Sequence, residues 1–228
     1  ELAADMVDIA DIHFGEINKL VSQQDNVRMY YTDGRNLLLT QNKRYDLISM
    51  ELTSIWFAGA ANLYNREFYQ LAKARLNDDG VLQQWVQLHH MRSLDLLYIL
   101  NTLHQEFRYV WLYVSGGQGI LVASDSEKAT QLYHLDGRAA DSIAALNEEE
   151  KALHDSLLLE PADMDYLAQK LRVPQFLVST DNNLYLEYAT PKGNAITYDA
   201  LATNIDMLTK LRQERLQKQG ESIPESGK

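Results

Sequence analysis

Two acidic residues stand where a parallel sheet would place ligand-binding side chains. Asp33 follows a run of strand-forming residues from Val27 to Tyr31, and Glu51 follows an apolar run from Asp46 to Met50. An open α/β sheet builds its ligand crevice from strands that end in this way and continue into a loop and a helix. Because Asp33 and Glu51 are 18 residues apart on successive expected strands, we expect both carboxylates at one edge of a shared sheet.

The composition narrows the class of ligand. The net charge is −11, from 21 basic and 32 acidic residues, which argues against nucleic acid because phosphate binding needs a basic face. An acidic crevice would suit a cationic substrate such as a polyamine, although the same charge could serve solubility alone. The absence of cysteine excludes disulfides, thiolate nucleophiles and cysteine zinc sites, and fits a reducing cytoplasm. No apolar run approaches the roughly 20 residues of a membrane span.

Alternating patterns predict an α/β fold with a doubly wound, mostly parallel sheet. Helical spacing is expected over residues 4–21, 35–39, 65–76, 94–107 and 196–219. Strands are expected at 27–31, 46–50 and 81–88, with an antiparallel hairpin formed by 110–114 and 120–123. The glycines between the hairpin strands supply positive φ. They are not expected to hold phosphate, because a strand and not a helix follows them.

Three further patterns complete the chain. Asn77 to Gly80 is expected to form a turn or a helix stop. Asp136 to Leu171 is helical and acidic in pattern, and Pro174 ends it. Residues 180–195 are polar and aromatic, and the tail from Gly220 is expected to be disordered.

His89 and His90 suggest a metal site. Adjacent residues of a strand point to opposite faces, so we expect these two rings not to share an ion. Plain readings also stay open for other residues: Asp33 as a helix cap before a glycine, and Trp56 and Trp85 as core aromatics.

Several of these stretches together resemble one family, the polyamine aminopropyltransferases or spermidine synthases. Their catalytic domain has the Rossmann-like fold of S-adenosylmethionine-dependent methyltransferases. The resemblance is strongest to a bacterial spermidine synthase-like branch that is often fused behind membrane-spanning segments. The stretches that carry it are residues 33–38, 45–49, 56–64, 67–69, 80–85 and 180–188.

The resemblance implies a role for each acid. Glu1 would accept hydrogen bonds from the ribose hydroxyls of decarboxylated S-adenosylmethionine, the co-substrate. Asp33 would accept from the adenine amine, with Gly34 allowing close approach. Glu51 would orient the attacking amine and accept its proton. No metal is implied, because the sulfonium is already a good leaving group.

Other side chains would line the amine site and stabilise the cations there. The resemblance places four of them at that site: Trp56, Tyr64, Gln84 and Gln87.

The resemblance also implies an organisation. Residues 1–135 would be the catalytic domain, lacking the glycine-rich cofactor loop that precedes Glu1 in the family. Residues 136–219 would be a helical extension packed on it, and 220–228 a disordered tail. The chain opens without methionine, so we expect it to be the interior of a larger protein. It would be cytoplasmic, or the soluble domain of a membrane-anchored protein, and a homodimer is compatible with it.

Two other functions stay open. One is methyl transfer from ordinary S-adenosylmethionine, because the fold and the nucleoside contacts are shared. The other is a non-catalytic nucleoside- or polyamine-binding domain of a membrane protein. The stretch Thr53-Ser54-Ile55 favours the second, because the family usually has Ser-Asp-Pro or Ser-Asn-Pro after its acid.

Overall fold

The computed structural model describes the chain except for residues 53, 131–151, 154, 172–176 and 221–228. It divides into two compact units, Glu1–Lys43 and Arg44–Lys228, which are described separately below. Residues 136–151 and 154 of the expected acidic helical region, and the expected disordered tail from residue 221, lie outside the described residues.

The first unit holds three short elements: α1 (Ala4–Asn18), a 3-10 turn (Val21–Gln23) and α2 (Gly34–Thr40). The expected helices are confirmed, but the strand expected at residues 27–31 is wrong, because these residues form no strand. A strand needs a neighbouring ladder to satisfy its backbone groups. No ladder reaches this stretch within the described residues, and the carbonyl of Tyr30 instead accepts a hydrogen bond from the Glu1 amino group at 3.1 Å.

The second unit is an α/β sandwich of one sheet with helices. Its strands are β1 (Tyr45–Met50), β2 (Leu76–Gln87), β3 (Tyr109–Ser115), β4 (Gln118–Ser124) and β5 (Leu157–Leu159). Its α-helices are α3 (Arg66–Ala74), α4 (Ser93–Glu106), α6 (Pro161–Leu171), α7 (Tyr185–Ala189) and α8 (Ala200–Gln219). Short 3-10 turns lie at Ala60–Leu63, Glu127–Thr130 and Thr190–Ala195.

The sheet is mixed, with the order β1-β2-β4-β3-β5. β1 and β2 pair in parallel, and β4 inserts antiparallel between β2 and β3. β1, β2 and β3 therefore point the same way, and β4 and β5 point the other way. The α/β class and the antiparallel β3–β4 hairpin are confirmed. Gly116 and Gly117 make its turn with φ of 56° and 79°, a conformation that other residues rarely adopt.

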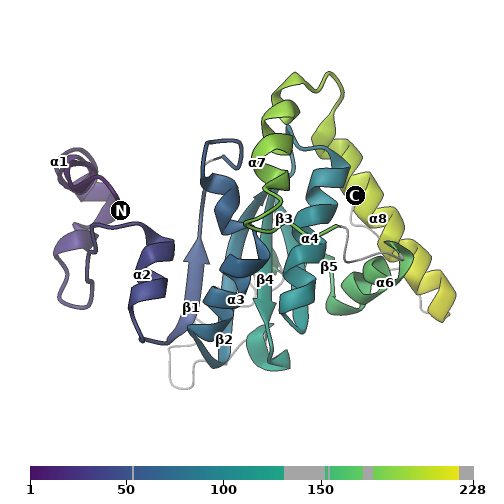
Figure 1. The fold of residues 1–228 in the computed structure, drawn as a ribbon, viewed down its shortest axis with the longest axis horizontal. Coiled ribbons are helices and arrows are strands. Elements are labelled where there is room, and N and C mark those ends of the chain that lie inside the picture. The colour runs from purple at the N-terminus through teal and green to yellow at the C-terminus, as the bar shows by residue number, and fades with distance from the viewer. Residues whose placement is uncertain (53, 131–151, 154, 172–176, 221–228) are drawn as a thin grey trace. The chain divides into compact units, whose positions relative to one another are not determined.

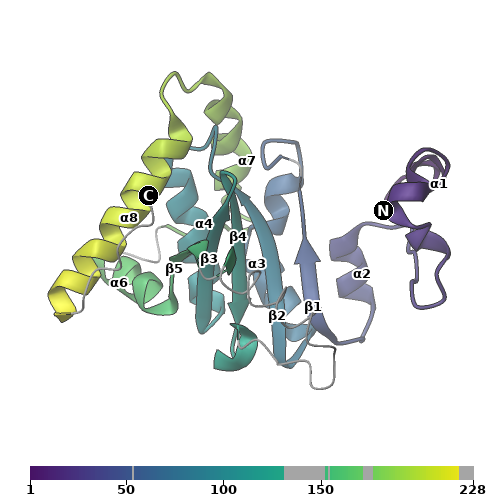
Figure 2. The same ribbon diagram turned by 180° about the vertical axis from the view of Figure 1, so that it is seen from behind.

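One face of the sheet carries the main core. Figure 1 shows α3 and α4 lying across this face, and Figure 2 shows the sheet from the other side. Leu82, Leu112 and Leu121 on this face are at most 1% exposed. Burying side chains of this size supplies most of the driving force for folding. On the other face, Trp85, Ile120 and Tyr113 lie side by side across β2, β4 and β3.

Two local expectations need correction. β1 is not buried on both faces: Leu47 is 57% exposed, because β1 is an edge strand of the described sheet. The turn expected from Asn77 to Gly80 lies within the span of β2, beside a register shift opposite Tyr45 and Leu47. A bulge of this kind disrupts the ladder locally without ending the strand.

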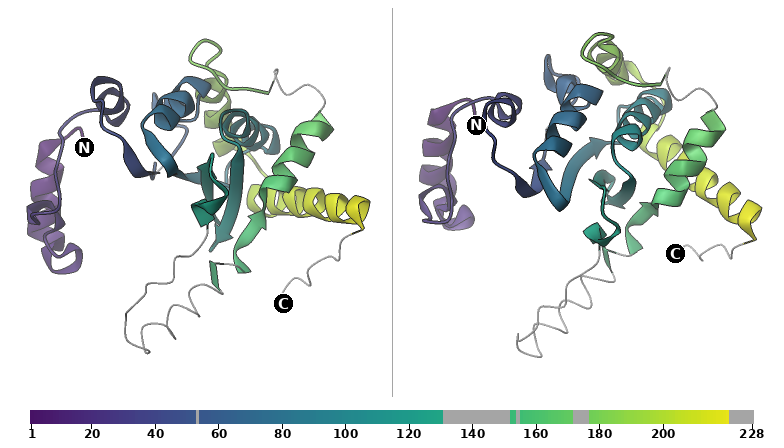
Figure 3. Two further views of the ribbon diagram at one scale, coloured as in Figure 1. Left: turned by 90° about the horizontal axis from the view of Figure 1, so that it is seen from below. Right: turned by 60° about the horizontal axis from the view of Figure 1, so that its bottom comes forward.

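The helical layer beyond β3 is held by buried charge. α6 and α8 lie side by side next to β5 (Figures 2 and 3). Asp163 of α6 is 0% exposed, and Arg215 of α8 donates to it through Nε at 2.7 Å. Arg212 adds hydrogen bonds to the carbonyls of Leu157 and Leu158 at 2.9 and 3.1 Å. β5 interrupts a region expected to be helical, because three apolar residues suffice to extend the sheet beside β3.

The buried pair predicts a large cost for removing one partner. Replacing Arg215 by Met should lower the free energy of unfolding by about 3 kcal/mol, because Asp163 would keep its charge in the core without its main partner. Urea unfolding measures this difference. Lys210→Met is the matched control, because its pair with Asp206 is exposed and should contribute less than about 0.5 kcal/mol. Equal effects of the two changes would contradict the expectation.

Candidate functional site

The carboxyl ends of β1 and β2 lie next to each other and carry most of the expected site residues. Met50 at the end of β1 pairs with Gln84 of β2, and Glu51 follows Met50 directly. The side chain of Glu51 is exposed. The parallel pairing therefore sets an accessible carboxylate beside the last part of β2, which is where open α/β sheets bind ligands.

Buried polar side chains tie the loop after Glu51 back to β2. The hydroxyl of Tyr64 donates to the carbonyl of Trp85 at 2.9 Å, and Gln84 Nε2 donates to the carbonyl of Leu63 at 3.0 Å. The hydroxyl of Tyr69 donates to Gln84 Oε1 at 2.8 Å. Tyr64 and Gln84 are each 1% exposed, and burial raises the pKa of Tyr64. Both side chains use their polar groups to shape the loop.

A pair of aromatic rings lies beyond the carboxyl ends of β1 and β2. Trp56 in the loop after β1 meets His90 after β2 edge-on, with ring centroids 6.4 Å apart. His89 and His90 also contact each other, at 5.4 Å between centroids. The geometry expected for them is wrong: they lie in a turn after β2 and not on opposite faces of a strand, and His90 has a φ of 52°. Burial and the neighbouring His90 lower the pKa of His89.

Gln87 offers an acceptor at this edge. It is 1% exposed, and its Nε2 donates to the carbonyl of His89 at 2.6 Å. Its Oε1 is buried and has no hydrogen-bond partner within the described residues. Buried acceptors are nearly always paired, so Gln87 Oε1 is an exception among the described residues.

Three expected site residues lie in the first unit. Asp33 caps α2, accepting from the N–H of Asn36 at 2.8 Å through Oδ1. Gly34 begins that helix, and a Cβ built on it would meet no atom within 4 Å. Glu1 accepts from the N–H of Ala3 at 2.9 Å, and this bond lowers the pKa of Glu1.

Sequence reasoning missed one set of contacts at this edge. Glu187 of α7 accepts from the backbone N–H of Gly59 at 3.0 and 3.2 Å through its two oxygens. The signal was present, because Glu187 lies in the polar and aromatic stretch at 180–188 that carries part of the family resemblance. Its partner is 128 residues away, however, and no pattern in the chain connects the two.

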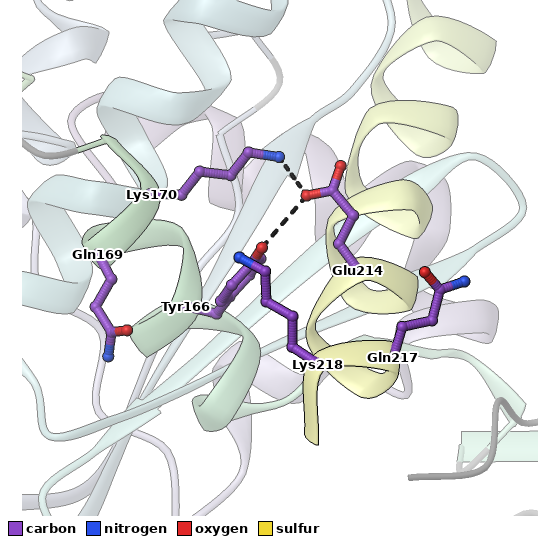
Figure 4. Close-up of a pocket in the computed structure, with 6 residues that line it drawn as sticks. All are labelled: Tyr166, Gln169, Lys170, Glu214, Gln217 and Lys218. Atoms are coloured by element: carbon purple, nitrogen blue, oxygen red, sulfur yellow. Dashed lines mark hydrogen bonds and ion pairs between the residues drawn. The ribbon is translucent and has the colours of Figure 1, made fainter. Parts of the chain in front are cut away.

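Two cavities lie away from this edge. One, of about 610 Å³, opens between α6 and α8 and is lined by Tyr166, Lys170, Glu214 and Lys218 among others (Figure 4). Glu214 there pairs with Lys170 and accepts from Tyr166, and Lys218 lies over the Tyr166 ring at 4.8 Å. A second, of about 310 Å³, lies where β2 begins, beside Arg44. Neither is lined by the expected site residues.

The comparison with known families identifies the family of this chain. A model of the spermine/spermidine synthase domain matches residues 1–128. The chain belongs to the spermine/spermidine synthase family. All the site residues expected from the sequence lie within the stretch that matches the family.

One relative and two solved structures are similar to this member of the synthase family. Polyamine aminopropyltransferase 2 of Hyperthermus butylicus is 27% identical over 139 residues, 58% of this chain and 46% of the relative. The chain thus spans about half the length of that relative. Human methyltransferase-like protein 13 in complex with SAH gives a TM-score of 0.46 at 19% identity, covering 67% of this chain and 68% of that one. Spermidine synthase from Thermotoga maritima gives 0.44 at 15%, covering 68% and 58%.

The described part of the chain has neither a cluster of metal ligands nor a helix suited to a membrane. No three acidic or histidine side chains gather there as ligands for a metal ion. Nor does any helix in the described part of the chain have the length and apolar character needed to cross a bilayer.

The buried hydrogen bonds of Gln84 predict a stability effect. Replacing Gln84 by Leu should cost about 2 kcal/mol or more in the free energy of unfolding, because the Tyr69 hydroxyl and the Leu63 carbonyl lose their partner in the core. Urea unfolding checks this value. Adding Tyr69→Phe should recover part of the loss by removing the stranded hydroxyl. A cost below about 0.5 kcal/mol for Gln84→Leu would show that these bonds do not hold the loop.

Proposed function

We propose that this chain transfers an aminopropyl group from decarboxylated S-adenosylmethionine to a polyamine. The observation that carries the proposal is the exposed carboxylate of Glu51 at the end of β1, in a chain whose residues 1–128 match the spermine/spermidine synthase domain. The acidic balance of the chain, −11 overall, supports a cationic substrate.

In the proposed reaction the amine nitrogen attacks the carbon next to the sulfonium. The new N–C bond forms as the C–S bond breaks, and the sulfur keeps the electron pair and leaves as methylthioadenosine. The attacking nitrogen must be unprotonated, and the product nitrogen must release a proton. Glu51 orients the amine and accepts that proton as a general base.

Residues in and after the carboxyl ends of β1 and β2 support the binding of an amine. Trp56 and His90 form an aromatic edge, and an aromatic face attracts a cation. Gln87 Oε1 has no protein donor within the described residues and would accept from an amine N–H. Tyr64 and Gln84 act indirectly, because their hydrogen bonds set the path of the loop after β1.

We also propose that three residues of the first unit hold the nucleoside. One oxygen of Asp33 caps α2, which leaves the other to accept from the adenine amine. The space beside Gly34 leaves its backbone open to a ligand. Glu1 would accept from the ribose hydroxyls. We further propose that residues 1–135 form the catalytic domain and that residues 136–219 form an extension packed on it.

Removing the charge of Glu51 tests its role as the base. We expect Glu51→Gln to lower the rate of aminopropyl transfer to putrescine or spermidine by a factor of about 10² to 10⁴, the usual contribution of a positioned base. Mass spectrometry of the product polyamine and of methylthioadenosine measures the rate. Asp46→Asn is the matched control, since Asp46 lies on the same strand at its other end and is exposed.

Unchanged turnover in Glu51→Gln would remove this residue from the mechanism. Supplying ordinary S-adenosylmethionine in a parallel assay separates the reactions. Methylated product in place of aminopropyl product would overturn the proposed function in favour of methyl transfer.

Asp33 can be tested without losing the helix cap. Ser is a good N-cap residue but carries no carboxylate, so Asp33→Ser should keep the stability of α2 and weaken the binding of methylthioadenosine. We expect its dissociation constant to rise by about tenfold, as for the loss of one charge-assisted hydrogen bond. Calorimetric titration measures the affinity, and thermal unfolding monitors the fold. Equal affinity of the Ser variant and the wild type would exclude the adenine contact.

A further inference from the structure

Both loops at the carboxyl ends of β1 and β2 are held by one segment from the C-terminal part of the chain. We name residues 178–195 the support segment; it contains α7 and the 3-10 turn that follows α7. The family match ends at residue 128, so this segment lies outside it. Figure 1 shows α7 beside the carboxyl ends of the strands.

The start of the support segment is anchored in the core. Ser179 is 0% exposed, and its hydroxyl donates to Asn65 Oδ1 at 2.6 Å. Its backbone N–H donates to the Thr102 hydroxyl at 2.9 Å, and its carbonyl accepts from the N–H of Arg66 at 2.9 Å. Three hydrogen bonds thus join Ser179 to the start of α3 and to α4, and leaving any of these groups unpaired in the interior would be costly. The support segment therefore starts from a rigid base.

The middle of the segment holds the loop after β1. Both carboxylate oxygens of Glu187 lie within hydrogen-bond distance of the N–H of Gly59, at 3.0 and 3.2 Å. Gly59 has a φ of 84°, which other residues rarely adopt. The buried hydroxyl of Thr190 adds a contact of 3.4 Å to the carbonyl of Ile55. Glu187 and Thr190 thus form hydrogen bonds to the loop on both sides of Trp56.

The end of the segment presses on the turn after β2. A Cβ built on Gly193 would lie 1.7 Å from the carbonyl oxygen of His90, so only glycine fits without displacement. Asn204 of α8 fixes the same turn by donating to the carbonyls of Leu88 and Met91, both at 2.9 Å. The two loops that carry Trp56 and His90 therefore share one support.

We propose that Glu187 is a positioning residue for the amine site, acting through Gly59 on the loop that bears Glu51 and Trp56. The proposal rests on the proposed aminopropyl transfer for its substrate, but the loop contact stands independently of it. A charged acceptor forms a stronger hydrogen bond than a neutral one, which explains a carboxylate at this place. Both of its oxygens lie within hydrogen-bond distance of this backbone N–H, and we assign its action to the loop.

Two substitutions of Glu187 distinguish an action through the loop from direct contact with the amine. Glu187→Ala removes the acceptor, whereas Glu187→Gln keeps an acceptor and loses the charge. Glu214→Ala is the control, since it deletes a surface carboxylate of α8 near the far end of that helix. Residue 214 lies ten residues from Asn204, on the order of 15 Å along the helix. Thermal unfolding confirms that each variant is folded.

Amide hydrogen exchange measures directly how well the loop after β1 is held. We expect exchange of the peptide covering residues 54–63 to rise by about tenfold or more in Glu187→Ala, as expected for losing a hydrogen bond to a charged group. Glu187→Gln should fall between Glu187→Ala and the wild type, and Glu214→Ala should match the wild type. Unchanged exchange in Glu187→Ala would overturn the proposal.

Steady-state kinetics read the effect on the substrate. We expect the KM for putrescine to rise in Glu187→Ala by about tenfold, with a smaller change in kcat and no change in the KM for decarboxylated S-adenosylmethionine. Glu187→Gln should recover most of this loss. If Gln is as damaging as Ala, the charge acts on the amine itself and the positioning role is wrong. If the wild type transfers nothing but exchange rises in Glu187→Ala, the proposed function fails and the loop support stands.

Discussion

The parallel pairing of β1 with β2 is the constraint on which the candidate site depends. Its backbone ladder sets Met50 opposite Gln84, and the next residue along β1 is Glu51. No side chain has to find its place by itself, because the ladder fixes which residues emerge together at the strand ends. A loop follows β1 and a turn follows β2 at the same end of the sheet, and the proposed chemistry depends on this register.

Polar burial gives this edge a defined shape. Tyr64, Tyr69 and Gln84 could have been apolar if only packing mattered, and their hydroxyl and amide groups are costly to desolvate. Each finds a partner on the loop or on β2, so the returning loop has one well-satisfied path and few competitors. Among the described residues, Gln87 Oε1 is an exception at this edge. That exception lies beside the residues to which we assign the amine, which agrees with the tendency of functional sites to depart from full satisfaction.

Much of this arrangement was accessible from the sequence, for identifiable reasons. β1, β2 and the β3–β4 hairpin follow from local patterns, namely apolar runs and a pair of glycines, and Glu51 follows from its place after such a run. The stretch at 27–31 has the composition of a strand but no ladder within the described residues, and composition cannot supply a neighbour. β5 is only three residues long, too short for a period to appear. The contact of Glu187 with Gly59 depends on tertiary folding alone, which no local pattern reports.

The close approach of Gly193 to His90 has a consequence for altering this protein. Two backbones meet there with no room for even a methyl group, so any larger residue at 193 would push the turn after β2 away from the 3-10 turn at Thr190–Ala195. That displacement would change the contact between Trp56 and His90, and it would leave the carboxylate of Glu51 unaltered. A substitution at residue 193, which does not itself contact the amine, could then widen the range of bulkier amines that the site accepts.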